Sequence, residues 1–150
     1  MRARRRQRRW FLGASLVGLA ACVACGSDLR GEAGQVAMRW FKEQLAEIGY
    51  VEHEGGLYAT PPTEAPGLIL GDAIEIQLRS LLISRVFPVD VTQEQREEGV
   101  EWSGQAVVTF EYRDRYHRSK ESRPWSEWAG DFWVLTLARS EDQWTIRRTS

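Results

Sequence analysis

Two segments in the C-terminal third of the chain repeat with a period of two residues, and this period constrains the fold more than any other feature. In the first segment, Ala106, Val108, Phe110 and Tyr112 share one face and Val107, Thr109, Glu111 and Arg113 share the other. The second segment, 131–139, alternates in the same way but is apolar on both faces. A period of two predicts β-strands. The doubly apolar segment is expected in the middle of a sheet, covered on both sides.

A different period precedes these strands. Apolar residues recur at helical spacing between residues 35 and 48, at Ala37, Trp40, Phe41, Leu45 and Ile48. Gly49 follows and can end a helix. The spacing predicts an amphipathic helix whose apolar stripe packs in the core.

Between the helix and the last strands, residues 50–60 read as a hairpin around Gly55-Gly56, and 61–67 as a Pro-rich loop. Residues 72–82 fit two structures. Asp72 and Glu75 form a capping box, which predicts a second helix to about Leu82, followed by a strand over 83–91. The alternation of Ile74, Ile76 and Leu78 with polar residues fits a strand instead.

This order of elements predicts an α+β domain, with one or two helices packed on a curved antiparallel sheet. It resembles the cone-shaped fold of nuclear transport factor 2-like, ketosteroid-isomerase-like and cystatin-like proteins. The resemblance covers roughly residues 35–150 and includes the closing hairpin that carries Trp144 and Ile146. It implies a sheet whose concave side can hold a pocket.

The N-terminus has the features of an export signal. Six arginines within residues 2–9 precede an apolar run, and small residues end it. The run from Trp10 to Ala24 spans about 22 Å as a helix, which is short of a ~30 Å hydrocarbon core. Residues 1–21 are therefore predicted to be a signal peptide rather than a permanent membrane span.

Leu19-Ala20-Ala21-Cys22 resembles the lipobox of bacterial lipoproteins. The resemblance implies cleavage before Cys22 and a lipid on its sulfur. Cys25 is a rival site, and an ordinary signal cut near Gly18 or Ala20 is the alternative. On this interpretation residues 22–34 are the lipidated cysteine and a flexible Gly/Ser-containing tether, and 35–150 form a single domain.

The signal also resembles the twin-arginine export motif at Arg8, Arg9, Phe11 and Leu12, although Gln7 stands where that family prefers Ser or Thr. Both cysteines lie at or before residue 25, so the predicted domain has no disulfide to form. Such a chain can fold in a reducing compartment before export.

Charge restricts the partners. The chain has 20 basic and 21 acidic residues, and six of the basic residues lie in the predicted signal, so the remainder carries a net charge of about −7. An acidic domain does not fit a nucleic-acid binder, which presents a basic face. Nor is it attracted to anionic lipid. The membrane is therefore expected to hold this chain through the lipid on Cys22.

Residues with catalytic potential are few. Tyr112, Asp114 and His117 near the end of one predicted strand can supply a base and a donor for proton abstraction, although the charged run around them also fits a solvated loop. Glu52-His53-Glu54 offers metal ligands beside a turn, but no metal, phosphate or nucleophile motif is present, and no metal or cofactor is predicted. Trp125 and Trp128 are candidates for surface contact with a ligand.

These observations predict a lipid-anchored protein of a bacterial cell envelope, facing the periplasm or the exterior. Its domain is expected to bind a small-molecule or protein partner without catalysis. The alternatives are a small pocket enzyme of isomerase or dehydratase type that uses Tyr112, Asp114 or His117, and a structural subunit of an envelope complex.

Overall fold

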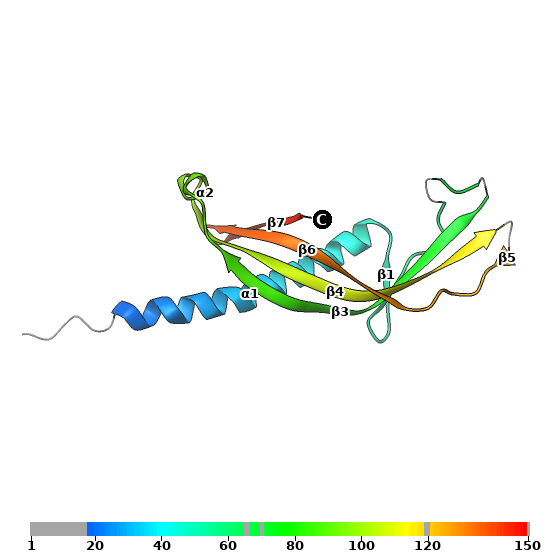
Figure 1. Cartoon of the computed structure of the whole chain (residues 1–150), viewed down its shortest axis with the longest axis horizontal. Coiled ribbons are helices and arrows are strands. Elements are labelled where there is room, and N and C mark those ends of the chain that lie inside the picture. Colours follow the sequence, from blue (N-terminus) through cyan, green and yellow to red (C-terminus); the bar gives the residue numbers. More distant parts are fainter. Residues whose placement is uncertain (1–17, 65–66, 70, 119–120, 150) are drawn as a thin grey trace, which may run out of the picture.

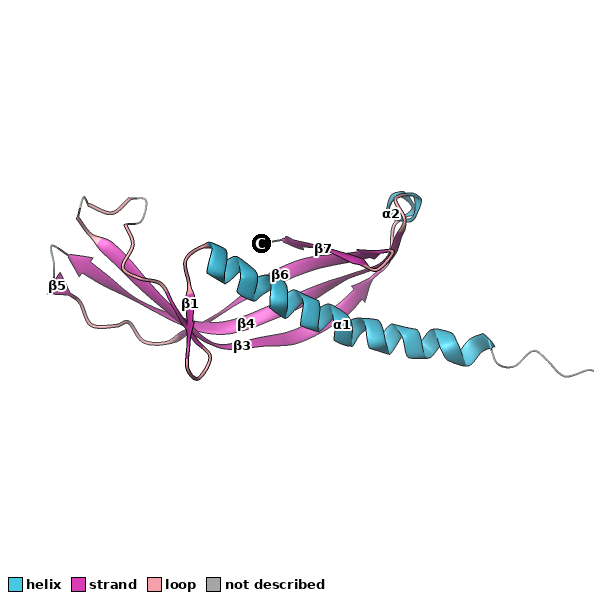
Figure 2. Cartoon of the chain, turned by 180° about the vertical axis from the view of Figure 1, so that it is seen from behind, coloured by secondary structure: helices cyan, strands magenta, loops and turns pink. Residues whose placement is uncertain are grey.

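A long helix lies against one face of an antiparallel sheet in the computed structural model (Figures 1 and 2). The structure describes residues 18–64, 67–69, 71–118 and 121–149, with the backbone alone over 18–28. In chain order the elements are α1 (Gly18–Glu47), β1 (Val51–His53), β2 (Leu57–Ala59), β3 (Ala73–Val89), α2 (Gln93–Glu97), β4 (Val100–Arg118), β5 (Glu121–Ser122), β6 (Ala129–Ser140) and β7 (Gln143–Arg148).

The strands pair in the order β1-β2-β3-β4-β6-β7, and β5 pairs with the far end of β4. All of these pairs are antiparallel, and most join strands that are neighbours in sequence. The longest strands, β3 and β4, bend along their length (Figure 1). The predicted α+β class, with an N-terminal helix packed on a curved antiparallel sheet, is confirmed.

The core lies between α1 and the sheet face that α1 covers, called the helix face below; the opposite face is called the open face. Phe41 is fully buried at the centre of this layer, between Phe110 of β4 and Trp133 of β6. Because side chains alternate along a strand, every second residue of β4 and β6 enters the core. The buried apolar residues are Ala33, Ala37, Phe41, Leu45, Tyr58, Leu78, Ala106, Val108, Phe110, Leu135 and Leu137.

The helix begins much earlier than residue 35, and residues 22–34, predicted as the lipidated cysteine and a flexible tether, lie within α1. Ala33 is fully buried, and Trp144 donates a hydrogen bond to Glu32 at 3.0 Å. A side chain on Gly34 would meet Val86 at 3.5 Å, so the small residues of this segment let the helix approach β3 closely. The folded domain therefore extends N-terminal of residue 35, and the first turns of α1 project beyond the sheet (Figure 2).

The predicted second helix over 72–82 is wrong, because residues 73–82 form the first part of β3. The whole strand pairs with β4, and a helix there would have left the backbone groups of that β4 edge unpaired. Ile74, Ile76 and Leu78 lie on the helix face, as the alternation indicates. The register shifts after Arg79, where Ser80 adopts a positive φ of 57°. The second helix is instead α2, a short segment with a capping box formed by Thr92 and Gln95.

Other predictions are confirmed. Residues 50–60 form the β1–β2 hairpin, whose turn has positive φ at Gly55 and Gly56. The strand β6 lies inside the sheet between β4 and β7. It is not covered on both faces by the described residues, however, because Phe132 on the open face is 57% exposed.

Candidate functional site

A groove opens on the helix face where α1 ends and the sheet continues beyond it. Its volume is about 200 Å³, and it lies between the last turn of α1 and strands β3, β4 and β6. Its described lining is predominantly apolar and aromatic: Phe41, Leu45, Ile48, Tyr50, Ile76, Leu78, Phe110, Tyr112, Asp131 and Trp133. Mostly apolar clefts with a few polar groups are the usual form of small-molecule sites.

The end of α1 shapes one wall of the groove. Gly49 has a φ of 96°, a conformation that suits glycine at a helix end, and the backbone N–H of Tyr50 donates to the carbonyl of Leu45 at 2.9 Å. This turn places Ile48 and Tyr50 beside the groove. Ile48 is 61% exposed, and burial raises the pKa of the Tyr50 hydroxyl.

The floor is an aromatic cluster. The ring centroids of Phe41 and Phe110 are 5.7 Å apart, and those of Phe41 and Trp133 are 4.9 Å apart in an edge-to-face arrangement. The guanidinium carbon of Arg148 lies 3.8 Å from the Trp133 ring centroid. Contacts of this kind hold the rings in place. The floor is therefore preformed.

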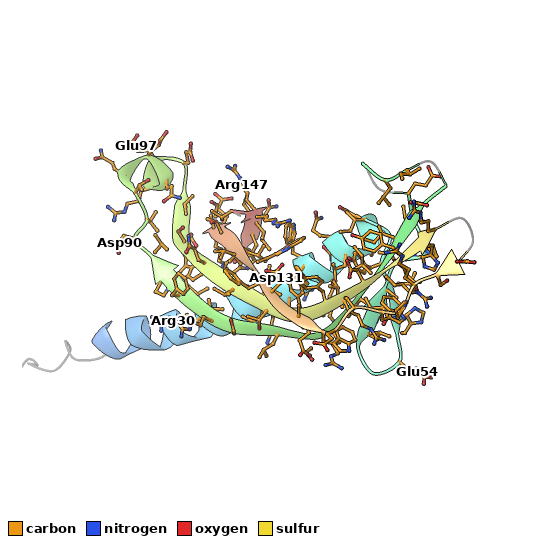
Figure 3. All side chains as sticks on the ribbon, turned by 45° about the vertical axis from the view of Figure 1, so that its right-hand side comes forward. Arg30, Glu54, Asp90, Glu97, Asp131 and Arg147 are labelled. Carbon is orange, nitrogen blue, oxygen red and sulfur yellow. The ribbon has the colours of Figure 1, made fainter. Side chains whose placement is uncertain are left out.

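Of the described residues that line the groove, Asp131 is the one with a charged side chain. It lies on β6 (labelled in Figure 3), directly across from Phe110 of β4, and its side chain is exposed. Its Oδ1 accepts a hydrogen bond from the backbone N–H of Phe132 at 2.8 Å. Among the described residues no Lys, Arg or His ion pair with this carboxylate is found.

The three residues with predicted catalytic potential do not converge on this groove. Tyr112 lines it. Asp114 follows on the same face of β4, opposite Ile76, but is not among the lining residues. His117 lies an odd number of residues after Asp114 on the same strand, so its side chain points to the opposite, open face.

His117 belongs to a polar network on the open face. Its Nε2 is 3.0 Å from Oε2 of Glu75, and its Nδ1 is 2.9 Å from the hydroxyl of Ser122. Arg115 donates to the same oxygen of Glu75. Burial by itself would raise the pKa of Glu75, but the hydrogen bonds from Arg115 and His117 outweigh it and lower the pKa. These hydrogen bonds join β3, β4 and β5 at one end of the sheet, and the network fits a structural role.

Trp125 and Trp128, the predicted surface-contact residues, pack on arginine side chains of the open face. The guanidinium of Arg113 is 4.8 Å from the Trp125 ring centroid and 4.5 Å from that of Trp128. Arg115 lies 4.5 Å from Trp125, and Arg79 lies 4.0 Å from Trp128. Both tryptophans are half-buried. The stack pins the segment before β6 to the sheet, and a ligand-contact role for these rings stays a prediction.

The residues that the sequence interpretation missed are at the rim of the groove. The sequence pattern predicts Ile48 in the core stripe of the helix and Tyr50 in the hairpin. Asp131 had a visible signal, because it is an acidic side chain on a strand that is otherwise almost continuously apolar. An acidic group in such a strand is expected only where solvent or a ligand can reach it.

Metal binding has no support in the described residues, in which no three His, Cys, Asp or Glu side chains lie close enough to hold an ion. His53, from the Glu52-His53-Glu54 run, instead lines a hollow of about 630 Å³ beside the β1–β2 hairpin. This hollow lies along the hairpin and the edge of the sheet and lacks the aromatic floor of the groove.

The predicted export residues Arg8, Arg9, Phe11 and Leu12 lie outside the described residues. Cys22 lies within α1, in the part for which the backbone alone is described. Within the described part of the chain no helix is both long and apolar enough to cross a membrane. Comparisons with protein-family models, curated proteins and solved structures found no match to this chain.

Proposed function

We propose that this chain is a lipid-anchored protein of the bacterial cell envelope whose α+β domain binds a small apolar ligand in the groove, without catalysing a reaction on it. The observation that carries the proposal is the groove itself: an aromatic floor, apolar walls and an open mouth at the end of α1. An exposed apolar cleft costs free energy in water, at about 25 cal/mol per Å² of apolar surface, which a bound ligand would recover.

A binding role is favoured over the enzyme alternative by the placement of the polar groups. The groove's described lining contains two phenols, those of Tyr50 and Tyr112, and the carboxylate of Asp131. Of the three predicted catalytic residues Tyr112 alone lines the groove, because Asp114 is not among the described lining residues and His117 faces the opposite side of the sheet. Proton abstraction requires a base and a donor that both reach one substrate.

The proposed anchor is joined to the domain by helix rather than by a flexible tether. From Cys22 to Ala33, where the core begins, α1 rises about 16 Å, and it rises about 35 Å from Cys22 to Leu45 at the groove. A lipid on Cys22 would then hold the domain on a short, stiff stalk. The groove would open at the far end of the helix, toward the aqueous compartment of the envelope.

The anchor predicts a specific difference between the two cysteines. In a bacterial host, Cys22→Ala should remove the lipid mass and release the protein from the membrane fraction, because multiple acyl chains supply the attachment at ~0.8 kcal/mol per buried CH₂. Cys25→Ala is the matched control and should stay lipidated. Intact-mass spectrometry of both fractions is the measurement. An unlipidated wild-type protein, or full membrane retention of Cys22→Ala, would refute the anchor.

The groove predicts saturable binding of an apolar probe. The full chain carrying Cys22→Ala, in which no attached lipid can compete, should bind the neutral fluorophore N-phenyl-1-naphthylamine with a 1:1 stoichiometry. Adding Ile48→Asp places a charge at the rim without touching the core, and should weaken binding at least tenfold because burying an unpaired carboxylate is costly. Fluorescence titration measures both.

Ile69→Asp is the control for this experiment, since Ile69 is 66% exposed and is not among the groove's lining residues. It should bind the probe as tightly as the parent. Equal weakening by both substitutions, or no binding by the parent, would contradict a ligand site in the groove.

A further inference from the structure

We infer that the groove selects a hydrophobic cation, such as an alkylammonium or quaternary ammonium compound, over neutral and anionic ligands of the same apolar size. This inference rests on the proposed ligand-binding function and adds the charge of the ligand to it. It follows from three features of the groove: the sign of its charge, the number of its aromatic rings and the position of its carboxylate.

The charge of the lining has one sign. Asp131 is acidic, and no Lys, Arg or His is present among the described lining residues. Two basic residues that adjoin lining residues have other contacts: Lys42, next to Phe41 in the chain, lies 3.7 Å from Glu52, and Arg148 is stacked on Trp133. An anionic head group would therefore enter beside a carboxylate without a counter-ion, which disfavours it.

The rings favour a cation. Tyr50 and Tyr112 line the groove beside the floor formed by Phe41, Phe110 and Trp133, and the rings of Tyr50, Tyr112 and Trp133 are partly exposed. The negative face of an aromatic ring attracts cations, and aromatic cages that bind quaternary ammonium groups work in this way. The chain itself uses this interaction on the same wall, where Arg148 approaches within 3.8 Å of the Trp133 ring centroid.

The carboxylate is placed to receive the charged end of such a ligand. Asp131 lies across from Phe110, and Tyr112 is the next residue on the same face of β4; both line the groove and are exposed. The Asp131 carboxylate accepts a hydrogen bond from the backbone N–H of Phe132. A cation can thus pair with Asp131 without displacing a basic side chain, while its apolar part lies against Ile48 and Ile76.

The test uses three probes that share an eight-carbon chain and differ in head-group charge: octyltrimethylammonium, octyl glucoside and octyl sulfate, each below its micellar concentration. Calorimetric titration of the full chain carrying Cys22→Ala should show that the ammonium probe binds at least tenfold more tightly than either of the others. Its affinity should also fall as salt is added, because screening weakens the attraction to Asp131.

Asp131→Asn should reduce the preference for the ammonium probe to about threefold or less, and should leave the affinity for octyl glucoside unchanged. Asp90→Asn is the matched control, since it removes the same charge from an exposed site beyond the end of β3, away from the groove. It should keep the full preference. Circular dichroism of both variants reports whether they fold, and the salt dependence of the parent tests the same attraction without any substitution at 131.

The outcomes separate this inference from the proposed function. Equal affinity for the three probes, or a preference that survives Asp131→Asn, overturns the cation selectivity and leaves the ligand groove standing. Binding of none of the probes, nor of the neutral fluorophore, overturns both.

Discussion

Replacing Phe41 by alanine is expected to lower the free energy of unfolding by about 3 to 5 kcal/mol, the range for truncating a fully buried phenylalanine. Phe41 has no exposed surface, and its ring contacts both Phe110 and Trp133. These three rings join α1 to β4 and β6 at the centre of the only layer interface in the described structure. The truncation removes apolar contact and leaves a cavity that a helix resting on a stiff sheet cannot readily close.

Urea denaturation followed by tryptophan fluorescence measures this loss. Phe132→Ala makes the same chemical change on the open face of β6, where the side chain is 57% exposed. It should cost less than about 1 kcal/mol, because exposed side chains contribute little to stability. Similar losses from the two variants would show that the helix–sheet interface is not the principal core.

Adding a methyl group at Gly104 is expected to destabilise the chain by about 1 to 3 kcal/mol, the usual cost of overpacking. A Cβ at this position would lie 2.8 Å from the carbonyl oxygen of Phe87 and would overlap the indole ring of Trp102, which folds over the glycine. The Phe87 carbonyl belongs to the backbone of β3 and cannot move without disturbing the β3–β4 ladder.

Movement of Trp102 would spread further, because its ring centroid is 5.3 Å from that of Trp144, and Trp144 donates to Glu32 of α1. We therefore expect Gly104→Ala to lower the urea midpoint and to weaken the near-ultraviolet circular dichroism of the tryptophans. Gly130→Ala is the control: Gly130 also lies in a strand, and nothing is within 4 Å of an added Cβ. That substitution should be neutral or slightly stabilising. The reverse order of effects would exclude close packing as the reason for glycine at 104.

The segment 72–82 shows why local pattern alone was insufficient. A capping box and a helical apolar face favoured a helix there, yet the same residues alternate in polarity. Pairing with β4 along the length of β3 stabilises the strand conformation of this segment. Pairing satisfies many backbone groups at once, and that gain exceeds the few tenths of a kcal/mol per residue that separate helix and strand preferences.

The start of α1 was missed for a similar reason. Residues 26–34 are polar and glycine-rich, which is typical of a linker. In the structure Ala33 is fully buried, and Gly34 lies beside Val86 and Ile83 of β3. A sequence pattern rich in small residues is typical of a flexible linker, but small side chains also permit a helix to pack closely against a sheet.

By itself the sequence determined the strands after residue 100, the helix over 35–48, the hairpin at 50–60 and the α+β class, because each depends on a local period or turn that neighbouring residues define. It also predicted the export signal and Cys22. Only the tertiary structure decided the groove, since Ile48, Tyr50, Tyr112 and Asp131 come from separate elements. It also decided that His117 faces away from them. The physical reason is that a site is made where elements end and cross, and strand register, which is set by long-range pairing, selects the side chains that meet there.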